Sequence, residues 1–285
     1  MILLTEIFDN VQDFRRSAPG VDANLSFDEL NASAESARKQ ILKVISITLW
    51  SKIILDKESD LCALLKNALA NLTMYKDLVF QIVSTRNSGS SAEVYKHEVE
   101  NMQRSYIDNY YSAMDSLLEL IESDADFQNT ATYSRRSTLR IKNAEELDNY
   151  YPIDQSYLFY ARTTSFQREI LVERLSDYYD QSDANEGRFT EKLNVILAKM
   201  IIAKALRVFD VIELPVTLRS LYKESKALRH GTAENTIVMQ MADALDQQAL
   251  DALKNIDLLL EDHSDDGSVD TETSFNEPCD KIYLL

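Results

Sequence analysis

The chain has 285 residues, 45% of them hydrophobic, and a net charge of −17, so it has enough apolar residues for a folded core and is not expected to be disordered. Its negative charge argues against a surface that grips free nucleic acid, because phosphate binding draws on clustered Lys and Arg. With 5 Gly and 4 Pro it has few turn-forming residues for sandwich, barrel or doubly wound folds, which favours an all-α fold, a bundle of long helices.

The N-terminal segment, residues 1–25, combines a short apolar element with a turn at Ala18-Pro19-Gly20. One helix is predicted over residues 26–55, with Ser26 as the capping residue at its start. Its apolar stripe consists of Leu30, Ala34, Ala37, Ile41, Val44 and Thr48. A polar turn over residues 56–60 then leads into the next helix, and so short a link predicts that the two helices lie antiparallel.

The stretch from Asp60 to Arg86 has the strongest helical pattern in the chain. Apolar residues recur three and four positions apart for about seven turns, at Leu61, Leu65, Ala68, Leu72, Tyr75, Val79 and Ile82. Ser59 can cap the start of this helix through its side-chain oxygen. The segment Asn87-Ser88-Gly89-Ser90 is expected to end it, since Gly tolerates a positive φ.

A second long helix is predicted over residues 90–122. Its buried side should contain Val94, Val99, Met102, Tyr106, Tyr110, Met114, Leu117, Leu118 and Ile121. Tyrosine is frequent here, and two interpretations remain open for it. These side chains could pack inside the bundle, or they could form half-buried contacts between subunits.

The segment SRRSTLRIK carries the strongest positive charge in the chain, in Arg135, Arg136, Arg140 and Lys142. It follows a predicted loop over residues 123–133. One interpretation is a solvated charge cluster, and the other is a docking patch for an acidic neighbour or a phosphate backbone. A short helix over residues 143–149 should end at Tyr150-Tyr151-Pro152, because the residue before Pro avoids the α region.

The rest of the chain is again helical in pattern, with helices expected over residues 154–180, 188–214, 216–229 and 233–260. The chain is therefore divided into an N-terminal helical half (1–150), a C-terminal helical half (151–260) and an extended tail (261–285). Residues 64–78 match 192–206 at a constant offset of 128, and each copy follows a helix expected to begin with Ser-Phe, at Ser26-Phe27 and Ser165-Phe166. The sequence leaves open whether the halves are a true duplication.

The C-terminal tail carries eight acidic residues and one Lys, and it ends in Ile282-Tyr283-Leu284-Leu285. Such a composition predicts an extended segment that does not fold alone. Its apolar end is either a docking peptide for a neighbouring subunit or simply the end of the tail. Residues 262–273 have the spacing of a calcium-binding loop, but Thr273 occupies the position of the bidentate Glu, so an acidic linker is favoured over a cation site.

Motifs for catalysis are not found in the sequence. Phosphate-binding and dinucleotide-binding glycine loops and the GxSxG elbow are missing, and the HExxH pattern that begins at His97 fails at Asn101. Two Cys and three scattered His give no metal site, so no catalytic residue, cofactor or metal ligand is predicted. Without an apolar run of 18 residues or a signal-peptide pattern, a soluble protein made in the cytoplasm, with no membrane partner, is expected.

Four segments carry a resemblance to a known family, and together they cover about residues 25–215: Phe27-x-x-Leu30 with the Ala-rich helix that follows, LLKNALANLTMYKDLVFQIVSTRNSG, VYKHEVENMQRSYIDNYYSAMDSLLELIE and ARTTSFQREI. The chain resembles virion proteins of Bacteroidetes phages and prophages that are encoded near the portal and major capsid genes. These look like large relatives of the helical head–tail connector (adaptor) proteins of tailed phages. One departure is Thr48-Leu49-Trp50, where the family often has a Leu-Gly pair, so the resemblance implies the family's fold but not its turn geometry at this point.

The resemblance implies a non-enzymatic structural protein in the neck or tail region of the virion, assembled in the host cytoplasm. Its subunits would form a homo-oligomeric, dodecameric ring that docks on the portal, joins neighbouring neck and tail proteins, and extends the DNA channel without sequence-specific binding. Candidate partner contacts are Arg135, Arg136, Arg140, Lys142, Ile282, Tyr283, Leu284 and Leu285. The alternatives are another helical virion component, associated with the tail or with cargo, and an all-helical enzyme.

Overall fold

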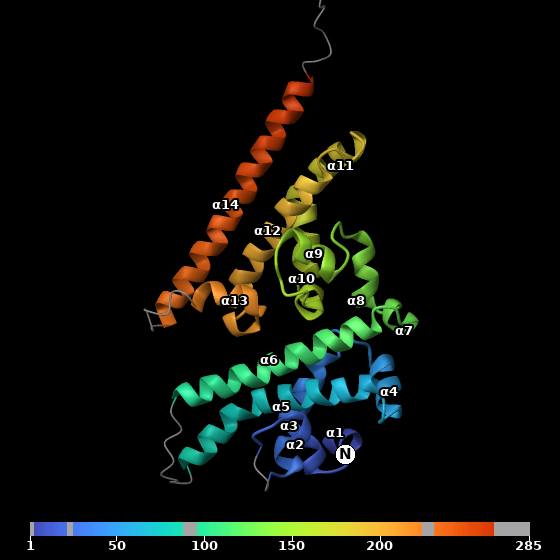
Figure 1. Cartoon of the computed structure of the whole chain (residues 1–285), viewed down its shortest axis with the longest axis vertical. Helices are drawn as coiled ribbons and strands as arrows, with labels where there is room; N and C mark the ends of the chain where they lie inside the picture. The colour runs from blue at the N-terminus through green and yellow to red at the C-terminus, as the bar shows by residue number, and fades with distance from the viewer. Residues whose placement is uncertain (1–2, 22–24, 88–95, 224–230, 265–285) are drawn as a thin grey trace, which may run out of the picture.

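The computed structural model describes residues 3–21, 25–87, 96–223 and 231–264 (Figure 1). Within these ranges the regular elements are helices and no strand occurs, so the predicted all-α fold is confirmed. None of the helices in these ranges is long and apolar enough to cross a membrane. The tail residues Ile282 to Leu285 and residues 265–273 of the candidate calcium loop lie outside the described residues.

The helices form two layers that meet along α6 (Figure 1). The first layer contains α1 (Leu3–Ile7), α2 (Val11–Ser17), α3 (Phe27–Ile41), α4 (Ile47–Leu55), α5 (Asp60–Asn87) and α6 (Lys96–Ile121). In it, α5 and α6 form a long hairpin, and α3 packs on α5.

The second layer begins with the short elements α7 (Ala125–Gln128), α8 (Ala131–Ser134), the 3-10 helix η1 (Arg135–Thr138) and α9 (Ala144–Tyr150). It continues with α10 (Tyr157–Ile170), the π-helical turn η2 (Leu171–Leu175), α11 (Ser176–Ala184), α12 (Thr190–Val208), η3 (Val211–Glu213), α13 (Val216–Lys223) and α14 (Gly231–Ser264). Helix α12 packs on both α10 and α14, while α10 also packs on α6 and so connects the layers. The proposed domain boundary at residue 150 stays a prediction.

Helix α5 begins where its sequence pattern indicates. The Ser59 hydroxyl accepts a hydrogen bond from the backbone N–H of Cys62 at 3.2 Å, which satisfies one of the free amides at the helix start. Leu65, Ala68 and Leu72 on the predicted stripe are fully buried. The helix extends to Asn87, and the expected stop at Gly89 lies outside the described residues.

The prediction of a single helix over residues 26–55 is wrong. The chain leaves the helical path after Ile41, and Ser46 caps a separate helix by accepting from the backbone N–H of Leu49 at 3.1 Å. A straight helix would have buried Thr48, which is exposed, whereas Leu49 and Trp50 are each 1% exposed. The break therefore turns the larger apolar side chains of α4 toward the core.

In α6, the buried side agrees with the pattern from Tyr106 onward, but Met102 is 37% exposed. Tyr106 and Tyr110 are buried within the chain, and the Tyr106 hydroxyl donates to the carbonyl oxygen of Pro19 at 3.2 Å. These two tyrosines therefore serve bundle packing, the first of the two interpretations. The first predicted residues of this helix, including Val94 and Tyr95, lie outside the described ranges.

Three further predictions need correction. The expected loop over residues 123–133 contains α7 and α8, whose starts are capped by Asp124 and Thr130. The expected helix over 188–214 ends at Val208. Ser165-Phe166 lies inside α10 and does not begin it, so that part of the repeat argument is wrong, and a duplication of the halves stays a prediction.

Candidate functional site

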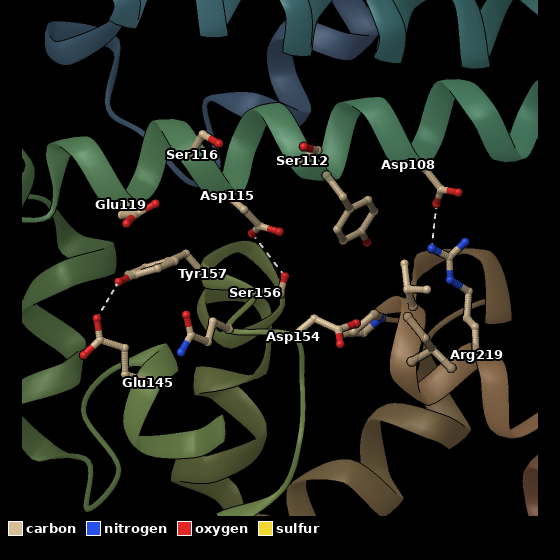
Figure 2. Close-up of a pocket in the computed structure, with 15 residues that line it drawn as sticks. Asp108, Ser112, Asp115, Ser116, Glu119, Glu145, Asp154, Ser156, Tyr157 and Arg219 are labelled. Carbon is tan, nitrogen blue, oxygen red and sulfur yellow. Dashed lines mark hydrogen bonds and ion pairs between the residues drawn. The ribbon is translucent and has the colours of Figure 1, made fainter. Parts of the chain in front are cut away.

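A cavity of about 370 Å³ lies between the two layers, under the middle of α6 (Figure 2). On the side of α6 the cavity is lined by a polar stripe formed by Asp108, Ser112, Asp115, Ser116 and Glu119. These residues recur at helical spacing, so they project from one face. The opposite wall comes from Glu145, the loop and first turn at residues 154–157, and residues 214–219 around the start of α13.

Asp115 joins the two layers through hydrogen bonds. Its Oδ1 atom accepts from the backbone N–H of Leu158 at 2.8 Å and from the Ser156 hydroxyl at 3.1 Å. Ser156 is itself the capping residue of α10 and accepts from the backbone N–H of Phe159. A carboxylate of α6 therefore satisfies one free amide at the start of a helix in the other layer, where the helix dipole favours negative charge.

The loop before α10 is held in a left-handed conformation. Asp154 and Gln155 have φ values of 58° and 50°, and Asp148 Oδ1 accepts from the backbone N–H groups of Ile153 and Gln155 at 2.7 and 3.1 Å. The Asp154 carboxylate accepts from the backbone N–H of Thr217 at 2.8 Å and from the Thr217 hydroxyl. It thereby supplies a cap for the start of α13 from outside that helix.

Two further pairs close the sides of the cavity. Arg219 binds the Asp108 carboxylate, with NH2 and Oδ1 separated by 2.6 Å, which connects α13 to α6 (Figure 2). The Tyr157 hydroxyl donates to Glu145 Oε1 at 3.0 Å. Burial and the nearby Glu145 charge raise the pKa of Tyr157 to about 12, so this hydroxyl stays protonated and remains a donor at neutral pH.

The pKa of the Asp115 carboxyl group is shifted within the site. Burial raises its pKa from 3.8 to about 6, and the Asp154 charge acts in the same direction. The hydrogen bonds from Leu158 and Ser156 act against that rise. Asp115 can therefore change its charge near neutral pH, while no group of His, Cys, Asp or Glu in the described ranges is arranged to hold a metal ion.

The predicted basic patch is not a single surface. Arg136 is 4% exposed, and its NH1 atom contacts Glu122 Oε1 at 2.5 Å, so its assignment to a partner-binding surface is wrong. Arg140 binds Asp183 at 2.8 Å and lies 4.5 Å from the centre of the Tyr179 ring. Arg135 and Lys142 are exposed, as a docking patch requires.

The cavity was not predicted from the sequence, although the residues that line it from α6 form a pattern that the sequence shows. The polar stripe on α6 has the same helical spacing as the buried stripe that was recognised on the opposite face. Glu145 and Arg219 could not be added to it, because their places depend on how the two layers meet.

No protein-family model, curated protein or solved structure matches the chain.

Proposed function

We propose that the chain is a subunit of a head–tail connector, a structural virion protein that docks on a portal ring and joins it to the tail. The observation that carries the proposal is the resemblance of the segments that form α3, α5, α6 and α10 to that family. The first three of these form the larger part of the first layer, and α10 holds the second layer against it.

The arrangement of the helices supports an architectural role. Helix α5 has 28 residues and α6 has 26, and the pair forms a long hairpin that α3 stiffens from one side (Figure 1). A long helix pair holds its two ends at a fixed distance, because its backbone hydrogen bonds are satisfied internally and its packed face resists bending. The net charge of −17 suits a channel protein that DNA must pass without adhering.

The first test is assembly with a purified portal ring from the phage or prophage that encodes the chain. Light scattering should give the mass of a small species for the chain alone and of a ring-bearing complex after mixing. The double variant Arg135→Glu/Lys142→Glu should weaken that complex if the exposed cations dock on the portal, and Arg168→Glu/Arg174→Glu, which reverses two exposed cations of α10 and η2, is the matched control.

The second test is location. A cryo-EM reconstruction of the virion should place the chain between portal and tail. Density for the chain away from the portal–tail axis would refute the connector and favour another helical virion component, associated with the tail or with cargo.

A further inference from the structure

One titratable carboxyl group, that of Asp115, takes part in the contact between α6 and the start of α10. Asp115 reaches across from α6 and holds the backbone N–H of Leu158 and the hydroxyl of Ser156 with a single oxygen atom. The cavity that lies beside this contact is lined by four further carboxylates, Asp108, Glu119, Glu145 and Asp154 (Figure 2). Proton binding at Asp115 therefore changes the charge at the place where the layers meet.

The cations around Asp115 are already paired with other groups. Arg219 of α13 binds Asp108 at 2.6 Å, and Arg162 of α10 binds Glu213 of η3 at 3.2 Å and contacts the Tyr111 hydroxyl of α6. In the described part of the chain Asp115 forms no ion pair. The charged and titratable groups that line the cavity with Asp115 are Asp108, Tyr111 and Glu119 of α6, Glu145 of α9, Asp154 before α10, Tyr157 of α10 and Arg219 of α13. Tyr110 of α6 also interacts with Asp115, and Arg162 of α10, with its partner Glu213 of η3, contacts Tyr111.

This arrangement makes the ionised form of Asp115 costly in the closed contact. A carboxylate without a cation loses hydration when it is buried, and the Asp154 charge repels it. Local opening of the contact would hydrate the carboxylate more fully than the closed contact does. The hydrogen bonds from Leu158 and Ser156 favour the ionised form, but burial and the Asp154 charge outweigh them. The neutral acid keeps an oxygen that can accept from both donors, and it gains less than the carboxylate from hydration on opening.

We propose that the contact between α6 and the N-terminus of α10 is a proton-sensitive joint, which proton uptake by Asp115 tightens and proton loss loosens. The joint acts on the attachment of the two layers and does not require the connector function.

Hydrogen–deuterium exchange of the full chain between pH 4 and pH 8, corrected for the intrinsic exchange rate, tests the proposal. The peptide to follow contains Leu158 and Phe159. With a carboxyl group whose pKa falls from about 6 in the closed contact to 3.8 when exposed, its opening constant should rise by up to about a hundredfold across this range. The matched internal control is the start of α4, where Leu49 donates to the Ser46 hydroxyl and no carboxylate takes part.

The variant Asp115→Asn keeps an acceptor oxygen for both donors and removes the titration. Its exchange at Leu158 should not depend on pH beyond the change seen at α4. An equal pH dependence in the variant and in the unchanged chain would overturn the proposal, and so would an unchanged chain with no pH dependence at Leu158. If the variant does not fold, carbon-13 titration of Asp115 in the unchanged chain decides, since a midpoint near 4 refutes the joint and one near 6 supports it.

Discussion

The neighbouring residues Arg135 and Arg136 have opposite environments, one exposed and the other buried. The Arg136 guanidinium lies 5.6, 5.0 and 5.1 Å from the ring centres of Phe127, Tyr133 and Tyr160, and it is paired with Glu122. A planar, weakly hydrated cation suits such an aromatic surrounding better than an ammonium group does. Arg135, one position earlier, is exposed.

Replacing Arg136 should therefore be far more damaging than replacing Arg135. Arg136→Ala leaves Glu122 without its cation and removes the stacking, and we expect a loss of about 3 kcal/mol in the free energy of unfolding. Arg135→Ala should change it by less than about 0.5 kcal/mol. Urea unfolding followed by circular dichroism measures both, and equal effects of the two variants would contradict the buried role of Arg136.

The raised pKa of Asp115 also predicts how global stability depends on pH. The folded state binds this proton more tightly than the unfolded state, so the contribution is present below pH 3.8 and is lost as the pH rises through about 6. Between pH 4 and pH 7, the unchanged chain should lose about 2 kcal/mol relative to Asp115→Asn. Urea unfolding at several pH values gives the difference, and parallel curves for the two proteins would contradict it.

At the scale of elements, the sequence predicts a helix boundary correctly where neighbouring residues determine it. The start of α5 was predicted correctly from the capping residue Ser59 and from the regular spacing of the apolar residues that follow it. The break before α4 was missed because β-branched residues and Ser46 only weaken a helix, and the core contact of Trp50 decides its direction. Arg136 was misassigned because its environment comes from Glu122 and Tyr160, which lie 14 and 24 positions away in the sequence.

The cap of α4 can be tested by Ser46→Ala. Loss of the hydrogen bond to the Leu49 amide should cost about 1 kcal/mol in the free energy of unfolding. Ser51→Ala, on the exposed side of the same helix, is the control and should be neutral or slightly stabilising, because Ala is the better helix former. A larger loss in Ser51→Ala than in Ser46→Ala would show that the helix does not begin at Ile47.

For the molecule as a whole, charge is distributed unevenly between its described part and its tail. The full chain has 30 basic and 47 acidic residues, and residues 265–285 contain six acids and one Lys. Two of the bridges that join elements, Lys52 with Asp124 and Asp126, and Arg207 with Asp243 and Asp246, have at least one exposed partner. Exposed pairs of this kind contribute little each, so repulsion among the excess acids should dominate the response to salt.

We therefore expect NaCl to stabilise the protein. Raising it from low ionic strength to about 0.5 M shortens the screening length and should increase the free energy of unfolding by on the order of 1 kcal/mol, or about 3 °C in Tm. A chain that ends at Ser264 has five fewer net negative charges, so its free energy of unfolding should increase less with salt. The effect of salt on apolar surface should be almost the same in both chains. Scanning calorimetry of both chains measures the difference. A Tm that falls with added salt would mean that the ion pairs between elements outweigh the repulsion, and that the acidic excess is not the main electrostatic term in this fold.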